Sequence, residues 1–155
     1  MLTLDLPSTA WLIAGSYAAA VVSALLPWVN GEVMLLAAVP TASARGAVLP
    51  LVLAFTLGQM TGKCAMYWLT RTATGRSQRV DAVVERWRER FERYPRWAVV
   101  LVFVSAMVGL PPFYAVSIAA GGLRLPFGRF VVAGGTGRFA HFGLLAYVPQ
   151  SLGFL

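Results

Sequence analysis

The sequence predicts an all-α integral membrane protein built from two inverted repeats, each a re-entrant helical hairpin followed by a transmembrane helix. Three observations lead to this prediction. The chain is strongly apolar, its apolar stretches include several that are too short to cross a bilayer, and one short motif occurs twice. We expect residues 1–155 to form a single membrane domain.

The composition indicates a membrane protein. Hydrophobic residues make up 58% of the chain and charged residues only 12%, whereas about 25% of the residues of a soluble protein are charged. Residues 6–31, 46–62 and 97–123 carry no charge. Because about 20 apolar residues span the hydrocarbon core, stretches of this length favour helices inside a bilayer.

The first apolar region predicts a hairpin over residues 8–44. Residues 8–26 are just long enough to cross a membrane, but the return arm, 33–44, would reach only about 18 Å of a core about 30 Å thick. Pro27 and Gly31 lie between the two arms and are expected at the hairpin tip. We interpret this region as a re-entrant hairpin that opens to the outside, with a full crossing by 8–26 as the alternative.

Residues 46–70 predict the first transmembrane helix. Residues 1–44 contain neither Lys nor Arg, and these residues collect on the cytoplasmic side, so this helix is expected to run from outside to inside. Its Gly58-x-x-x-Gly62 spacing would let another helix approach closely.

Residues 75–96 contain seven of the 13 cations and predict an amphipathic helix on the cytoplasmic surface. This concentration accounts for much of the net charge of +7, so we expect no nucleic-acid partner. Apolar residues recur there at helical spacing: Val80, Val83, Val84, Trp87, Phe91 and Tyr94.

The second apolar region repeats the plan of the first. Residues 97–110 would reach about 21 Å as a helix, and the adjacent Pro111 and Pro112 break the helix at a second predicted tip. We expect 97–123 to form a hairpin that opens to the inside, followed by a transmembrane helix over 127–149. The second unit is then inverted relative to the first.

A repeated motif links the two units. "TGKCAMYWL" (61–69) and "TGRFAHFGL" (136–144) share Thr, Gly, a cation, Ala, an aromatic residue and Leu in one register. Inverted repeats whose broken helices meet at mid-membrane are typical of transporters. Equivalent helices are therefore expected to present Lys63 and Arg138 to one central site.

Five residues are candidates for a substrate or proton pathway. Glu32 would exchange a proton or, alternatively, would favour the positive end of the helix that Asn30 caps. Lys63 would hold an anion or snorkel to the interface. Arg138 would pair with a ligand or with Glu32, and His141 would be a hydrogen-bonded buried residue or a proton relay.

The second tip, "GLPPFY" (109–114), contains no acidic residue. The free N–H groups at the start of its return arm, together with the side chain of Arg138, would attract an anion such as phosphate. One His, one Cys and few carboxylates give no metal-ligand spacing and no paired acids. We therefore predict neither an enzyme nor a bound metal or cofactor.

In their order along the chain, four segments resemble the DedA family, also called the SNARE-associated or VTT-domain superfamily. These segments are "SALLPWVNGEVMLLAAV" (23–39), "LGQMTGKCAMYWLTRTATG" (57–75), "GLPPFYAVSIAAGGLRLPFGRF" (109–130) and "GGTGRFAHF" (134–142). The resemblance is nearest to the short bacterial branch. It implies two membrane-embedded hairpins, a multi-pass protein of the bacterial inner membrane, and movement of lipids or lipid-linked phosphates between leaflets.

The resemblance also assigns a candidate coupling role to Glu32, which matches the acid of the family's first hairpin. Two features depart from the family pattern. Lys63 stands where many members carry an acid, and Met107 and Phe113 stand where arginines often flank the second tip.

We therefore expect a protein that moves a lipid, with membrane lipids and a phosphorylated lipid carrier as partners and a homo-oligomer as its assembly. A proton-coupled transporter of a small ion is the first alternative. A non-transporting membrane-homeostasis factor, whose basic helix binds a partner or anionic lipid, is the second.

Overall fold

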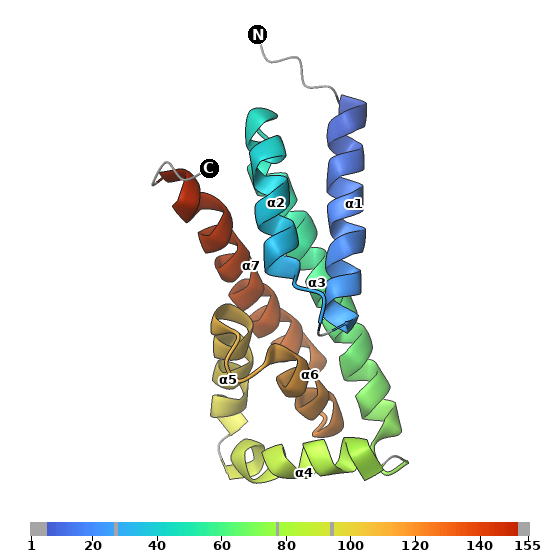
Figure 1. The fold of residues 1–155 in the computed structure, drawn as a ribbon. Helices are drawn as coiled ribbons and strands as arrows, with labels where there is room; N and C mark the ends of the chain where they lie inside the picture. Colours follow the sequence, from blue (N-terminus) through green and yellow to red (C-terminus); the bar gives the residue numbers. More distant parts are fainter. Residues whose placement is uncertain (1–5, 27, 77, 94, 152–155) are drawn as a thin grey trace.

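The prediction of an all-helical protein is confirmed. The computed structural model describes residues 6–26, 28–76, 78–93 and 95–151, and within these ranges it contains seven α-helices and no strand (Figure 1). Pro27, expected at the first tip, lies outside the described residues.

The first three helices form a hairpin and a long helix. Helix α1 (Leu6–Leu25) runs from the upper end of the molecule to its middle, α2 (Gly31–Ala44) returns, and α3 (Val48–Ala73) runs to the lower end (Figure 1). Helix α1 packs mainly on α3. At about 1.5 Å per residue, the 14 residues of α2 reach only about 21 Å.

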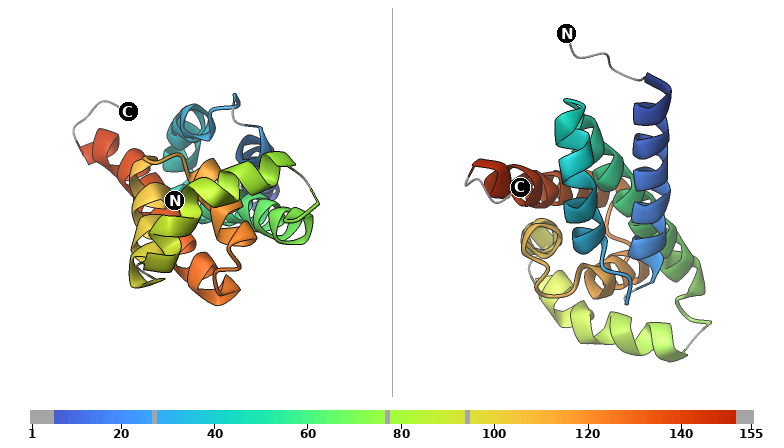
Figure 2. Two further views of the ribbon diagram at one scale, coloured as in Figure 1. Left: turned by 90° about the horizontal axis from the view of Figure 1, so that it is seen from below. Right: turned by 45° about the horizontal axis from the view of Figure 1, so that its top comes forward.

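Helix α4 (Gln78–Arg93) lies across the lower end of the bundle, as the view from below shows (Figure 2). It is anchored there by Val84, which is buried against Gly122 of α6. The side chains of five residues of the predicted apolar face lie outside the described part of the structure: Val80, Val83, Trp87, Phe91 and Tyr94.

The last three helices repeat this arrangement from the opposite end. Helix α5 (Pro95–Val108) rises from the lower end to the middle, α6 (Phe113–Gly122) returns, and α7 (Phe127–Ser151) runs to the upper end (Figure 1). Glycine inside a helix weakens it, yet α7 is continuous through Gly134, Gly135 and Gly137.

Glycines allow each hairpin to approach its long helix closely. A Cβ built on Gly62 of α3 would lie 2.5 Å from the Cβ of Ala24 and 3.2 Å from the carbonyl oxygen of Val21. A Cβ on Gly137 of α7 would lie 2.8 Å from the Cβ of Ala106. The two glycines occupy the same position in the repeated motif, so α1 packs on α3 as α5 packs on α7.

Helices α3 and α7 cross in antiparallel directions, and two aromatic pairs hold the crossing. Tyr67 of α3 stacks on Phe130 of α7 with ring centroids 5.1 Å apart, and Phe55 of α3 meets Phe142 of α7 edge to face at 5.8 Å. The spacing from Phe55 to Tyr67 in α3 equals the spacing from Phe130 to Phe142 in α7. Phe55 therefore corresponds to Phe130 and Tyr67 to Phe142, and each pair joins one residue of each kind.

The outer surface of the bundle is apolar. By length and composition, Pro7–Leu25 and Val48–Ala73 can each cross a membrane. Large apolar side chains are exposed along the outside of several helices, including Trp11, Leu57, Val132 and Leu144. Extended apolar surface of this kind marks a protein that lies in lipid.

Adding a methyl group at Gly137 should destabilise the protein. The new Cβ would lie 2.7 Å from the carbonyl oxygen of Phe103, so Gly137→Ala forces α5 away from α7 and should cost about 1–3 kcal/mol. The measurement is the free energy of unfolding in detergent.

Gly135→Ala is the matched control, because a Cβ there meets nothing within 4 Å. It should be neutral or stabilising by about 0.5–1 kcal/mol, since Ala favours a helix over Gly. Equal losses of stability in the two variants would contradict close α5–α7 packing at Gly137.

Candidate functional site

A polar cavity of about 430 Å³ lies where the two hairpin tips meet. The first tip contributes residues 28–32, and the second contributes Gly109 and residues 112–114. Side chains from α3 and α7 complete the lining, among them Lys63 and Arg138. The cavity therefore unites both hairpins, both long helices and both repeated cations.

Lys63 is buried beside the first hairpin. Its side chain is 5% exposed, and its Nζ donates a hydrogen bond to the carbonyl oxygen of Ala24 at 2.7 Å. It therefore does not snorkel to the interface. An ammonium group has three donors, so two remain beyond the bond to Ala24. The ring of Tyr114 lies 5.7 Å from Nζ on the cavity side.

Arg138 is held by aromatic rings rather than by a carboxylate. Its guanidinium lies 5.1 Å from the ring of Phe113 and 5.7 Å from that of Phe142, positions that allow cation–π attraction. Its Nε is buried and has no hydrogen-bond partner within the described ranges. A buried donor without a hydrogen-bond partner costs about 1–3 kcal/mol. An anion that entered the cavity and accepted this hydrogen bond would recover that free energy.

Glu32 pairs with His141 rather than with Arg138. The carboxylate Oε1 of Glu32 lies 2.9 Å from Nε2 of His141, while Nδ1 of His141 lies 2.7 Å from the carbonyl oxygen of Met107. The contact joins α2, at the tip of one hairpin, to α7 and to α5 of the other hairpin.

This geometry places one shared proton between Glu32 and His141. A carbonyl oxygen only accepts, so Nδ1 must carry a hydrogen toward Met107. The 2.9 Å contact then needs a second hydrogen, on Nε2 or on the carboxyl group. In either form one hydrogen lies between Nε2 and the carboxyl group and completes the hydrogen bond.

Asn30 and Gly31 shape the first tip. The Asn30 Oδ1 accepts hydrogen bonds from the backbone N–H groups of Glu32 and Val33 at 2.9 and 3.3 Å, so Asn30 caps α2. Gly31 is buried where a Cβ would lie 2.7 Å from Ser23 Oγ and 2.8 Å from Gln59 Nε2. The tip can therefore pack closely against α1 and α3.

The second tip has a different construction. Gly109 adopts a φ of +82°, which L side chains rarely take, and Ser105 Oγ donates a hydrogen bond to the carbonyl oxygen of Pro111. Pro112 precedes α6 and offers no side chain to cap its first N–H groups. The positive end of α6 therefore stays open beside the cavity.

Two buried polar side chains of the lining, Gln59 and Ser23, were not predicted from the sequence. Gln59 Nε2 donates a hydrogen bond to Ser23 Oγ at 2.7 Å, both residues are buried, and both line the cavity. The signal for Gln59 is its place inside the Gly58-x-x-x-Gly62 segment, one turn before Lys63. Ser23 gives no sequence signal, because small hydroxyl residues are common in apolar helices.

The fold and the site define a helical membrane protein with a polar centre. The family model of the VTT domain matches residues 6–151. The chain therefore belongs to the VTT-domain family, which is the DedA or SNARE-associated family, as the sequence motifs indicated. No curated protein and no solved structure matches this chain.

Proposed function

We propose that this protein moves a lipid with a phosphorylated head group between the leaflets of a membrane. The observation that carries the proposal is the cavity between the hairpin tips, which contains two cations and one carboxylate. The cavity places Lys63 and Arg138 beside the single carboxylate of Glu32, which is already bonded to His141. The two cations repel each other, and an anion between them would relieve that repulsion.

Three kinds of donor converge on the place where the anion would bind. The free donors of Lys63, the unpartnered Nε of Arg138 and the uncapped positive end of α6 all border the cavity. Phosphate binds well to guanidinium groups and to helix N-termini. A phosphate monoester at the end of a lipid chain combines that head group with a tail that stays in the bilayer.

The internal symmetry of the chain supports an inverted-repeat transporter. The two hairpins enter from opposite ends of the molecule, and α3 and α7 are antiparallel (Figure 1). Asn30 precedes α2 and Pro112 precedes α6. Ser23 and Ser105 are separated by the same number of residues as Asn30 and Pro112, so the two hairpins can be aligned without a gap between these positions. In our proposal both hairpins are re-entrant, and their tips alternately open the cavity to each leaflet.

A second candidate function is proton-coupled transport of a small anion, and the Glu32–His141 contact favours it. That contact ties the two hairpins together only while it holds a proton. The charged or titratable groups facing it are Lys63 from α3, Tyr114 from α6 and Arg138 from α7; in their described parts, α1 and α5 contribute none to the cavity. In lipid transport and in small-anion transport alike, proton release would break the hydrogen bond that links the two hairpins.

We also propose a location and partners for this activity. The DedA-type motifs support the bacterial inner membrane, with membrane lipids and a phosphorylated lipid carrier as the molecules bound. The small size of the chain favours a homo-oligomer that encloses the pathway. We propose no catalytic step, metal or cofactor.

Removing the Arg138 charge should slow lipid movement. Wild-type protein in vesicles should speed the equilibration between leaflets of a fluorescent lipid that ends in a phosphate monoester, and Arg138→Gln should slow it about tenfold or more. A charge-assisted hydrogen bond is worth about 1.5–3 kcal/mol, and each 1.4 kcal/mol is about tenfold. The measurement is the fraction of lipid accessible to an impermeant quencher over time.

Arg124→Gln is the control, because Arg124 is exposed between α6 and α7 and does not line the cavity. It should match wild type. Equal rates in empty and protein-containing vesicles would refute lipid transport. Phosphate uptake without lipid movement would instead support the small-anion transporter.

Glu32→Gln should remove the response to a pH gradient. A glutamine amide can donate to Nε2 of a neutral His141, so the contact persists but cannot release a proton. Imposed pH gradients should change the wild-type rate of lipid movement and leave the rate of the variant unchanged. A variant that responds like wild type would exclude the Glu32–His141 pair as the coupling group.

A further inference from the structure

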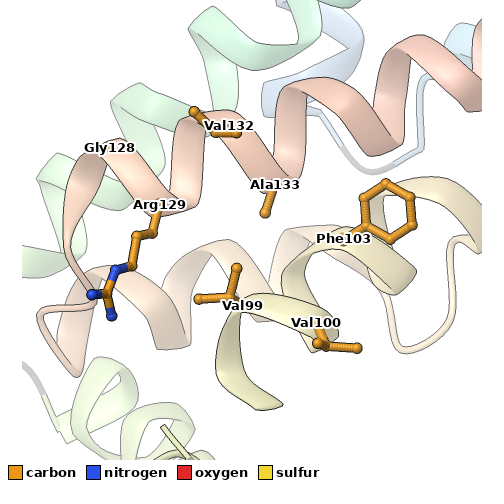
Figure 3. A pocket seen from close by; sticks show the side chains of 7 residues that line it. All are labelled: Val99, Val100, Phe103, Gly128, Arg129, Val132 and Ala133. Atoms are coloured by element: carbon orange, nitrogen blue, oxygen red, sulfur yellow. The ribbon is translucent and has the colours of Figure 1, made fainter. Parts of the chain in front are cut away.

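An open groove runs between α5 and α7 on the outside of the bundle (Figure 3). It encloses about 500 Å³, within the range of ligand pockets. None of its lining residues borders the central cavity, so it is a separate site. Its walls are formed by Val99, Val100 and Phe103 of α5 and by Gly128, Arg129, Val132 and Ala133 of α7.

Apart from Arg129, the side chains that line the groove are apolar. Val100 is 45% exposed and Val132 is 66% exposed, so the walls lie open to whatever surrounds the helices. A Cβ built on Gly128 meets nothing within 4 Å, which leaves room at that end. In a membrane protein, an open apolar groove on the outside of the helices faces lipid chains, which are as apolar as its walls.

Arg129 stands at one end of the groove, and Phe103 stands toward the other (Figure 3). The Arg129 side chain extends from that end rather than across the groove, and it is exposed. Within the described residues no carboxylate pairs with it. A guanidinium binds a phosphate group through two parallel hydrogen bonds.

The neighbours of Arg129 place this end of the groove at the level of lipid head groups. Helix α5 begins at the same end, with Arg96 and Trp97 in its first turn, and Trp97 is 65% exposed. Exposed Trp and Arg side chains favour the membrane–water interface. A lipid whose chain lies in the groove would therefore carry its head group beside Arg129.

We propose that this groove binds one anionic glycerophospholipid from the leaflet on the α4 side. One acyl chain lies against Val100 and Val132, and the phosphate contacts Arg129. Lipid chains are as apolar as the groove, so the fit alone gives little preference among lipids. Selectivity comes from the charge of Arg129, which should favour an anionic head group about fivefold.

Native mass spectrometry of the detergent-purified protein, mixed with phosphatidylglycerol and phosphatidylcholine of identical chains, tests this site. Wild type should retain phosphatidylglycerol about fivefold better. Arg129→Gln should keep both lipids and lose the preference. Gly128→Leu adds a side chain at the end of the groove, where a Cβ meets nothing within 4 Å, and should retain less of both lipids.

Arg124→Gln removes an exposed charge at the same end without touching the groove, and it should behave like wild type. Three results would overturn the proposal: a preserved preference in Arg129→Gln, an equal loss in Arg124→Gln, or full retention in Gly128→Leu. Melting temperatures of all variants show whether each is folded. Because lipid retention is measured without transport, the result is independent of the proposed function.

Discussion

The enclosure of buried Lys63 and half-buried Arg138 between the hairpin tips is the constraint on which the rest of the structure depends. Lys63 and Arg138 are positioned by helices α3 and α7, and a charge inside an apolar helix bundle is tolerated only when protein or a polar cavity surrounds it. The broken backbone of the tips has the same requirement, because unpaired N–H and C=O groups cannot face lipid. Cations and tips therefore share one enclosed polar centre.

Close packing provides that enclosure. Gly62 and Gly137 lie one position before the two cations and bring α1 and α5 against the backbones of α3 and α7. The stacked pair Tyr67–Phe130 and the edge-to-face pair Phe55–Phe142 close the crossing between the long helices. The repeated motif thus supplies the cation, the glycine that lets the hairpin pack closely and the aromatic residue that packs at the crossing.

The sequence was sufficient for the features that depend on local chemistry. Apolar length, prolines and the motif predicted a helical membrane protein whose two cations face one site, and the cap formed by Asn30 followed from its place before Gly31. The partner of Glu32 could not be predicted, because His141 is far away in the chain and the contact requires α2 and α7 to meet. The continuity of α7 through its glycines could not be predicted either, because glycine has a weak helix propensity and tertiary packing overrides it.

The central claim is that both tips lie near the middle of the bilayer, and the depth of their exposed side chains tests it most directly. Trp28 is 78% exposed at the first tip and Leu110 is 70% exposed at the second, whereas Trp97 lies in the first turn of α5 at the lower end. Proteins with a single tryptophan, at position 28, at position 97 or introduced by Leu110→Trp, can be placed in vesicles whose lipids carry a quencher at the head group or at the chain end. We predict that the chain-end quencher acts most strongly at positions 28 and 110, and the head-group quencher at position 97. Strongest quenching of Trp28 by the head-group label would show that α1 crosses the membrane, and would contradict a cavity formed by two re-entrant tips.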